Sequence, residues 1–526
     1  MVANYKHEVA TRDSEFVSGP ALILRALASD PGRQAFVTAD GAGITAGDFA
    51  ATTYRLAHEL IARGVTVGST VTLLTGNTPE ALSARYAAGL AGARVVNLYD
   101  GMSAPVLAEI TASVDTSLLL VDAERYATAP ELLPLVDVPA VLTLGPGPVA
   151  ADGAVGEDVI AASAHRPAEP PAVRVGPDDD LGIRHTGGTT GIPKGILSLH
   201  GPYRRVFDAP VGSDPAAGAP RLLAPTPLAH LSGILSDLTL QRGGTVVLQR
   251  SFEPGAVLTA IERERITDLW LLPPLLHQLL DHPAVGHTDL SSLRTIPYGG
   301  SAASPTRIRE AFKVFGPVLF GVYGMSEAQL ISMLTPQEHD RIGHGGQVSV
   351  GRPVPGVEVA IRALDGTDLP TGGQGEVHLR SDTVMAGYWK RPDLTAAVLR
   401  DGWLNTGDVG YFDEDGYLYL ADRAKDLIIV VGGHVYPSEV EDLLITHPAV
   451  ARCAVFGVRD DQETEHVHVA VVPAPGQRPT LAELRAFVTE RKGRIFAPEV
   501  LHLVDEIPLT PVGKPDKKLL RDSHAG

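Results

Sequence analysis

Residues 185–195 read HTGGTTGIPKG. It holds four glycines, three threonines and one lysine, so it can bury little apolar surface. Glycines let a backbone approach an anion closely and turn several N–H groups toward one point. The threonine hydroxyls add donors, and Lys194 adds a positive charge. The composition therefore indicates a phosphate-binding loop, although the Gly-Lys-Ser/Thr ending of a Walker A loop is missing.

The overall composition limits the class of protein. The chain has 526 residues, 44% of them hydrophobic, which is enough for several domain-sized cores. A formal net charge of −18 argues against nucleic acid as a partner, because phosphate backbones need a basic surface. A single cysteine, Cys453, excludes an internal disulfide and is typical of a reducing compartment. The N-terminus lacks an apolar signal region and no run reaches about 18 apolar residues, so we expect a cytoplasmic protein without integral membrane association.

The pattern of apolar residues predicts an α/β fold class. Helical patterns alternate with short apolar runs over 1–180 and again over 181–350, which predicts two α/β subdomains with parallel strands. Short strands with Gly/Asp turns over 351–422 predict a small β-rich, barrel-like subdomain. Together these form the expected N-terminal domain, 1–422. A smaller mobile α+β domain, hinged to it, is expected over 423–526.

Six further motifs follow the glycine-rich loop. They are PLAHLSG (227–233), PYGGSA (297–302), VYGMSEA (322–328), GWLNTGDVG (402–410), DRAKDLIIVVGGHVYPSEVE (422–441) and PLTPVGKPDKK (508–518). In order and spacing, these motifs and the loop resemble the signatures of the adenylate-forming superfamily, which contains acyl-CoA synthetases, peptide-synthetase adenylation domains and beetle luciferases. The resemblance covers nearly the whole chain. It implies an acid–thiol ligase that uses ATP, Mg²⁺ and coenzyme A.

The resemblance implies an adenylate-binding role for residues in three of the motifs. Tyr323 is expected to stack on adenine, Ser326 to contact the α-phosphate region and Glu327 to hold Mg²⁺, chemistry that suits an aromatic face and a carboxylate. Asp408 is expected to accept both ribose hydroxyls, as carboxylates do in other nucleotide sites, with Arg423 beside it. The other implied ATP/AMP-binding residues are Thr186, Gly187, Gly188, Thr189, Thr190, Lys194, Gly300, Ser301, Ala302, Val322 and Gly324.

Lys514 matches the family lysine that enters the active site during adenylation. A carboxylate that attacks an α-phosphate faces repulsion between two anions, and a mobile ammonium offsets that repulsion. We expect the C-terminal domain to rotate about the hinge residue Lys425 after adenylation. The rotation would withdraw Lys514 and bring a coenzyme A-binding loop with Gly432, Gly433 and His434 to the thiol entrance. Lys517 and Lys518 are expected to be solvated surface charges.

The expected acyl pocket is apolar. His230, the third implied catalytic residue beside Lys514 and Glu327, occupies the position between the acyl pocket and the thiol tunnel. Peptide-synthetase relatives tend to place an aspartate there, so His230 argues against an amino acid, although Asp237 keeps that alternative open. A hydrophobic carboxylic acid is therefore the expected substrate. The implied pocket residues are His230, Ser232, Gly299, Gly300, Val322 and Met325, with Leu228, Leu231, Leu272, Pro273 and Pro274 nearby.

The sequence departs from the family pattern at two places, and both are implied to contact coenzyme A and not the adenylate. The glycine pair 432–433 lies one position later than in many relatives, and Phe496 stands where many relatives have lysine. Coenzyme A remains the expected acceptor. Open alternatives are loading of a carrier-protein phosphopantetheine, a single half-reaction, a luciferase-like oxidase and a non-enzymatic nucleotide-binding regulator. A homodimer is compatible with the family resemblance.

Overall fold

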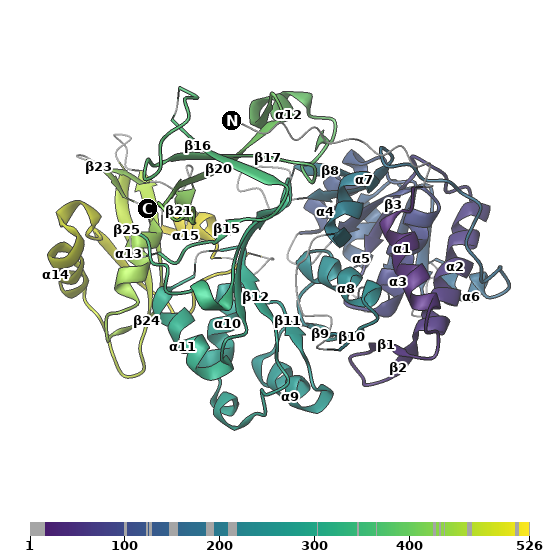
Figure 1. Ribbon diagram of the computed structural model, residues 1–526, viewed down its shortest axis with the longest axis horizontal. Coiled ribbons are helices and arrows are strands. Elements are labelled where there is room, and N and C mark those ends of the chain that lie inside the picture. The colour runs from purple at the N-terminus through teal and green to yellow at the C-terminus, as the bar shows by residue number, and fades with distance from the viewer. Residues whose placement is uncertain are drawn as a thin grey trace, which may run out of the picture.

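The computed structural model describes residues 16–98, 103–122, 125, 129–146, 156–185, 194–208, 218–301, 303–344, 347–363, 365–423, 428–430, 433–435, 437–459, 465–510 and 515–524. In Figure 1 the purple and blue N-terminal region and the yellow C-terminal region lie at opposite ends, with the teal and green regions between them. The predicted α/β fold class is confirmed: helices cover mostly parallel sheets in the N-terminal part, and a β-rich region and a smaller α+β region follow.

The seven-stranded sheet is buried on both faces. Its strands, in spatial order, are β18 (Gly387–Tyr388), β8 (Gly195–Leu199), β7 (Asp180–His185), β4 (Arg94–Leu98), β3 (Thr70–Leu74), β5 (Leu118–Asp122) and β6 (Val141–Leu144). β3 to β7 are parallel, whereas β8 and β18 are antiparallel to their neighbours. Every residue of β3 and of β5 is buried, as expected for parallel strands between two helical layers.

Helices pack on both faces of this sheet. The helices are α1 (Gly19–Ala28), α2 (Ala46–Ala62), α3 (Pro79–Leu90), α4 (Ala104–Ser113), α5 (Ala129–Leu132), α6 (Val159–Ser163) and α7 (His200–Arg205). Residues of α1, α2 and α3 form one core with Val71 and Leu73, and residues of α4 form another with Leu74. α3 begins where Thr78 caps the backbone N–H of Ala81 and a proline follows, both strong start signals.

Two further sheets accompany the seven-stranded sheet. The five-stranded sheet has the order β11 (Asp268–Leu269), β9 (Arg221–Ala224), β10 (Thr245–Leu248), β1 (Gln34–Val37) and β2 (Gly43–Thr45). The four-stranded sheet has the order β12 (Ile296–Gly299), β13 (Leu319–Met325), β14 (Gln329–Leu334) and β15 (Arg352–Pro353). The accompanying helices are α8 (Leu231–Gln241), α9 (Pro254–Glu264), α10 (Pro273–Asp281) and α11 (Pro305–Phe315).

The sheets do not follow the subdomain boundary that we placed at residue 180. β7 and β8 lie after that boundary but complete the first sheet, whereas β1 and β2 lie near the N-terminus but pair with β10 in the second. β18 reaches the first sheet from residue 387, inside the predicted β-rich segment. Periodicity identifies a strand but not its partner, because pairing is decided by contacts between residues far apart in sequence.

The β-rich region contains a five-stranded antiparallel sheet. Its strands are β16 (Val357–Arg362), β17 (Gly375–Ser381), β19 (Leu399–Arg400), β20 (Trp403–Phe412) and β21 (Leu418–Arg423), and α12 (Pro392–Val398) lies beside it. β20 lies in the middle, because β17 pairs with one edge and β19 and β21 with the other. Figure 1 shows this green sheet between the N-terminal and C-terminal regions.

The C-terminal region has its own core. It contains the pair β22 (Ile428–Val430) and β23 (Gly433–Val435), the sheet β24 (Val450–Arg459), β25 (Glu465–Pro473) and β26 (Val500–Leu503), and the helices α13 (Pro437–Leu444), α14 (Leu481–Lys492) and α15 (Lys517–His524). Val440, Val469 and Leu484 from three of these elements are fully buried in one cluster. No helix in the described parts of the chain is both long and apolar enough to cross a bilayer.

Candidate functional site

The glycine-rich loop is held at both ends by one strand pair. His185 ends β7 and faces Gly195, the first residue of β8, across the antiparallel pair. His185 is 3% exposed, and burial lowers its pKa to about 4, so it is neutral near pH 7. Of the implied loop residues, Lys194 lies within the described chain, and its side chain is exposed. Thr186, Gly187, Gly188, Thr189 and Thr190 lie outside the described residues.

At the ends of β12 and β13, glycines allow the backbone to lie close to the backbone of the neighbouring strand. A Cβ atom at Gly299 would lie 2.1 Å from the carbonyl oxygen of Val322, and one at Gly324 would lie 2.3 Å from that of Gln329. Gly300 has φ of 80°, a conformation that side chains rarely tolerate. The Ser301 hydroxyl is shielded from solvent and has no partner among the described residues, which fits a site completed by a ligand. Ala302 lies outside the described residues.

Tyr323 and Asp408 meet at this edge from two different sheets. Tyr323 belongs to β13 and Asp408 to β20, and both are less than 10% exposed. The Tyr323 hydroxyl donates a hydrogen bond of 2.6 Å to Oδ2 of Asp408. On the edge of β20 that pairs with β21, the backbone of Asp408 is in register with the backbone of Arg423. Two of the implied nucleotide contacts are therefore in direct contact with each other.

Glu327 lies in the tight turn between β13 and β14. The turn is closed by a hydrogen bond of 3.1 Å from the N–H of Ala328 to the carbonyl of Met325, and Gln329 follows with φ of 61°. The residue is 8% exposed, and Oε1 accepts a hydrogen bond of 3.0 Å from the hydroxyl of Tyr388. Among the described residues, Tyr388 is the side chain that donates to Glu327, and it uses Oε1 alone.

Glu327 fits a site in which one Mg²⁺ ion would be bound by the protein and the nucleotide together. A carboxylate oxygen is a preferred Mg²⁺ ligand, and Mg²⁺ commonly takes one or two carboxylates and completes its shell with phosphates and water. Among the described residues, no three histidine, cysteine or acidic side chains converge on a point. Glu327 would therefore hold the ion with the ATP phosphates, not within an all-protein cage.

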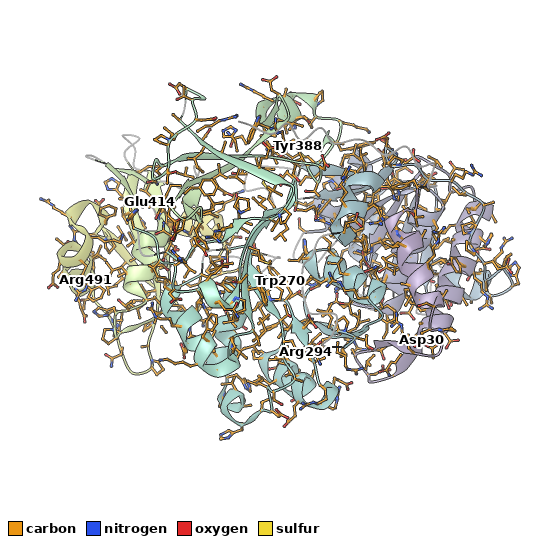
Figure 2. The ribbon with its side chains drawn as sticks, viewed as in Figure 1. Asp30, Trp270, Arg294, Tyr388, Glu414 and Arg491 are labelled. Atoms are coloured by element: carbon orange, nitrogen blue, oxygen red, sulfur yellow. The ribbon has the colours of Figure 1, made fainter. Side chains whose placement is uncertain are left out.

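Tyr388 belongs to the site although the sequence analysis did not identify it. It comes from β18, which pairs with β8 directly after the glycine-rich loop. Its ring centroid lies 5.1 Å from the Lys194 ammonium, within range of a cation–π interaction. Figure 2 labels Tyr388 near the green β-rich region and the N-terminal region. No motif chosen from the sequence contained this residue, and only the strand pairing brings it to Glu327 and Lys194.

His230 lies directly before α8, in a segment that Asn77 holds by its side chain. The Asn77 amide group donates to the carbonyls of Thr226 (3.0 Å) and Gln249 (2.9 Å), and its oxygen accepts from the N–H of Leu228 (3.0 Å). Within the first turn of α8, Ser232 is 2% exposed and its hydroxyl bonds that of Thr226. The Ser232 side chain is therefore buried and bonded to Thr226 of the same segment.

The predicted apolar pocket residues do not form one cluster. Leu231, Leu272 and Val322 belong to the same hydrophobic cluster, which includes residues of α9 and α10. Leu228 packs in the N-terminal core, whereas Met325 packs against the β-rich sheet. Three of the apolar residues, from separate parts of the sequence, therefore share one cluster, and Val322 among them is paired with Gly299 across β12 and β13.

Asp237 is not free to bind a substrate ammonium. One carboxylate oxygen accepts from Arg85 and Tyr86, and the other accepts from Tyr203. The residue is 2% exposed, and burial raises the pKa of its carboxyl group and of both tyrosine hydroxyls. The open alternative of an amino acid substrate therefore loses the residue on which it depended.

The expected hinge, coenzyme A-binding loop and C-terminal lysine segment are described in part. Lys425, Gly432 and Lys514 lie outside the described residues. The backbone of Gly433 and His434 starts β23, in register with β22, and Leu509 is bridged to Pro515 beyond the lysine. Lys517 corrects one expectation, because it forms an ion pair of 2.9 Å with Glu441 and is not a solvated charge. Lys518 is exposed, as expected.

Comparisons with known proteins identify the family of this chain. Residues 24–389 match the AMP-binding enzyme family and residues 439–514 match the AMP-binding enzyme C-terminal domain. The chain belongs to the AMP-binding enzyme family and thus to the adenylate-forming superfamily that its motifs resemble. It is therefore related to ligases that activate acids with ATP.

Three relatives illustrate the range of products in the family. The chain is 36% identical to the medium/long-chain-fatty-acid–CoA ligase FadD8 of Mycobacterium tuberculosis over 88% of this chain and 82% of the relative. It is 36% identical to a feruloyl-CoA synthase of Amycolatopsis sp over 90% of this chain and 92% of that relative. The structure of the amide bond synthetase McbA from Marinactinospora thermotolerans matches with a TM-score of 0.85 and 40% identity, covering 95% of this chain and 99% of that one.

Proposed function

We propose that this protein activates a hydrophobic carboxylic acid as its acyl-adenylate, with release of pyrophosphate, and then transfers the acyl group to the thiol of coenzyme A. The observation that carries the first half is the hydrogen bond by which Tyr323 of β13 meets Asp408 of β20, with Glu327 in the turn that directly follows β13. In this proposal these three residues make the base, ribose and metal contacts that the motifs imply. The family membership and the coenzyme A ligases among the relatives support the second half.

The proposed adenylation depends on positioning and charge. In this proposal Asp408 accepts the ribose hydroxyls and Tyr323 contacts the base, which fixes the α-phosphorus relative to the acid. The apolar side chains of Leu231, Leu272 and Val322 bind the organic part of the acid and exclude water. Lys194 and Lys514 offset the negative charge gathered at the reacting phosphate. Mg²⁺ bound at Glu327 would neutralise phosphate charge and favour departure of pyrophosphate.

The proposed transfer step needs the adenylate as a leaving group. A carboxylate oxygen leaves poorly, whereas AMP leaves readily, so the thiol attacks the carbonyl carbon of the acyl-adenylate and the carbon–oxygen bond to AMP breaks. The thiol proton is released as the thioester forms. In this proposal rotation about Lys425 moves Lys514 away and brings the loop with Gly433 and His434 toward the carbonyl.

An amine acceptor is the second candidate, and one observation favours it. The amide bond synthetase McbA is 40% identical to this chain over nearly its whole length, above the 36% of FadD8. The departures at 432–433 and Phe496 also concern the coenzyme A side of the family pattern. In this version the acyl-adenylate forms in the same way, and a neutral amine replaces the thiol as nucleophile.

The test is a panel of fatty, aromatic and heteroaromatic acids screened for pyrophosphate release, each with coenzyme A, with a phosphopantetheinylated carrier protein, with a primary amine, and without an acceptor. The proposal predicts acid-dependent pyrophosphate release and a thioester mass with coenzyme A. An amide mass without a thioester would select the second candidate. ATP binding without release of pyrophosphate for any acid would contradict both.

Replacement of Asp408 by asparagine is expected to raise the KM for ATP about tenfold. The asparagine keeps one acceptor for Tyr323 but loses the charge and one acceptor for a ribose hydroxyl, and hydrogen bonds to a charged group contribute about 1.5–3 kcal/mol. The measurement is pyrophosphate release against ATP concentration. Asp413→Asn is the matched control, because Asp413 also accepts from a tyrosine, Tyr419 at 3.0 Å. An equal rise in both variants would contradict the role of Asp408.

A further inference from the structure

A short segment from the β-rich region connects two parts of the proposed phosphate site. We call residues 385–389 the tether. The N–H of Met385 donates to the carbonyl of Glu327 (2.7 Å), and the N–H of Ala386 donates to the carbonyl of Leu197 in β8 (3.1 Å). The N–H of Trp389 donates to the carbonyl of Gly195 (2.7 Å), the residue that follows Lys194. The tether is therefore bonded to the turn that carries Glu327 and to the exit of the glycine-rich loop.

The side chain of Tyr388 makes a second set of connections between the same two parts. Its hydroxyl donates to Oε1 of Glu327 at 3.0 Å, and its ring faces the Lys194 ammonium at 5.1 Å. The residue is 9% exposed and packs in the cluster that contains Ile196 of β8 and Tyr323 of β13. One buried aromatic side chain thus contacts both the expected metal-binding carboxylate and the expected phosphate-binding cation.

We infer that Tyr388 is a positioning residue for the Mg²⁺–nucleotide complex: its hydroxyl fixes the carboxylate of Glu327 so that the second oxygen faces the cation, and its ring holds Lys194 beside the phosphates. This inference rests on the proposed function, because it takes Glu327 and Lys194 as groups that bind Mg²⁺ and ATP. Tyr388 itself need not touch the substrate. It acts by limiting the orientations of the two groups that do.

The chemistry of tyrosine suits this task. A neutral phenol can donate one hydrogen bond to a carboxylate without neutralising its charge, so the carboxylate remains a metal ligand. The Tyr388 hydroxyl uses its one proton on Oε1 of Glu327. The ring face offers Lys194 a cation–π partner that does not compete with phosphate for the ammonium protons.

The backbone of the tether does not depend on the Tyr388 hydroxyl. β18 pairs with β8 through main-chain hydrogen bonds, and the N–H of Tyr388 donates to the Thr395 hydroxyl at 2.9 Å. Removal of one oxygen atom leaves these contacts and the packing of the ring unchanged. Tyr388→Phe is therefore expected to fold, and its effects report on Glu327.

The first measurement is nucleotide binding by isothermal titration calorimetry with a non-hydrolysable ATP analogue, with Mg²⁺ and with EDTA. In the unmodified protein Mg²⁺ is expected to tighten binding. Tyr388→Phe is expected to reduce that Mg²⁺-dependent gain about tenfold and to leave the affinity in EDTA unchanged, the size expected for one hydrogen bond to a charged group. Tyr388→Leu also removes the ring, so it is expected to weaken binding in EDTA as well.

The second measurement is pyrophosphate release against Mg²⁺ concentration at saturating ATP and acid. Tyr388→Phe is expected to raise the half-saturating Mg²⁺ concentration about tenfold, while kcat at saturating Mg²⁺ stays near that of the unmodified enzyme. A merely structural role would lower kcat and leave the Mg²⁺ dependence unchanged.

Tyr417→Phe is the matched control. The Tyr417 hydroxyl donates to Oε1 of Glu338 at 2.7 Å, and the residue is 3% exposed, so the substitution removes the same kind of bond from a different part of the fold. Unchanged Mg²⁺ dependence in Tyr417→Phe together with the shift in Tyr388→Phe would support the inference. The same Mg²⁺ dependence in Tyr388→Phe and the unmodified protein would overturn it.

The two measurements separate this inference from the proposed function. Calorimetry needs no acyl substrate, so a Mg²⁺ effect that Tyr388→Phe reduces would support the inference even if no acid in the panel released pyrophosphate. Normal acid activation with an unaltered Mg²⁺ response in Tyr388→Phe would overturn the inference and leave the proposed function standing.

Discussion

Replacement of Asp237 by alanine is expected to lower the free energy of unfolding by about 3–5 kcal/mol, because it leaves a largely buried charge without its partner. Asp237 accepts hydrogen bonds from Arg85, Tyr86 and Tyr203, which come from α3 and α7, and it lies on α8. Its side chain is 3% exposed and that of Arg85 is 18% exposed. The substitution would leave the guanidinium and two buried hydroxyl groups without their acceptor.

Urea denaturation followed by circular dichroism measures this loss. Glu358→Ala is the matched control, since Glu358 forms an ion pair of 2.6 Å with Arg380 in which both side chains are at least half exposed. Exposed pairs contribute about 0–1 kcal/mol, so this control should unfold near the midpoint of the unmodified protein. If the two variants were equally stable, Asp237 would not hold the three helices together in the way the structure indicates.

Replacement of Lys514 by alanine is expected to slow pyrophosphate release about 10²–10³-fold, the loss typical when one preorganised charge-stabilising group is removed from a reacting centre. Transfer of the acyl group from a supplied acyl-adenylate is expected to be largely retained, because the proposed rotation removes Lys514 before that step. The two half-reactions are measured separately, by pyrophosphate release from ATP and acid and by AMP release from the acyl-adenylate and the acceptor.

Lys518→Ala is the matched control for Lys514→Ala. Lys518 is an exposed cation four positions away in the sequence, so its removal changes the net charge by the same amount. It is expected to leave both half-reactions near their normal rates. Equal losses in both half-reactions for Lys514→Ala would contradict a lysine that acts in adenylation alone.

Local patterns in the sequence predicted the fold class, because they report on burial. Within the alternation predicted over 1–180, β3 and β5 are fully buried parallel strands, and α2 is one of the helices. Local patterns could not place the subdomain boundary at 180, because a boundary depends on which strands pair. The seven-stranded sheet takes a strand from residues 387–388, and no local pattern reports a partner at that separation.

In the candidate site, too, some residues follow from sequence motifs and others only from the tertiary structure. Tyr323, Glu327 and Asp408 are proposed as site residues from their motifs, and the structure brings Tyr323 into contact with Asp408. Asp237 was misjudged as a group that could face the substrate, because its sequence position does not reveal that Arg85 and two tyrosines surround it. Tyr388 was missed for the opposite reason, since no motif marks it and its partners lie far away in sequence.

By itself, the sequence determined the α/β class, the adenylate-forming motifs and the residue types available for nucleotide chemistry, because each of these depends on composition and short-range spacing. Only the tertiary structure decided which strands share a sheet, that Asp237 is enclosed by donors and that Tyr388 joins Glu327 to Lys194. Those features depend on contacts between segments tens to hundreds of residues apart, and such contacts form when packing and hydrogen bonding bring the segments together.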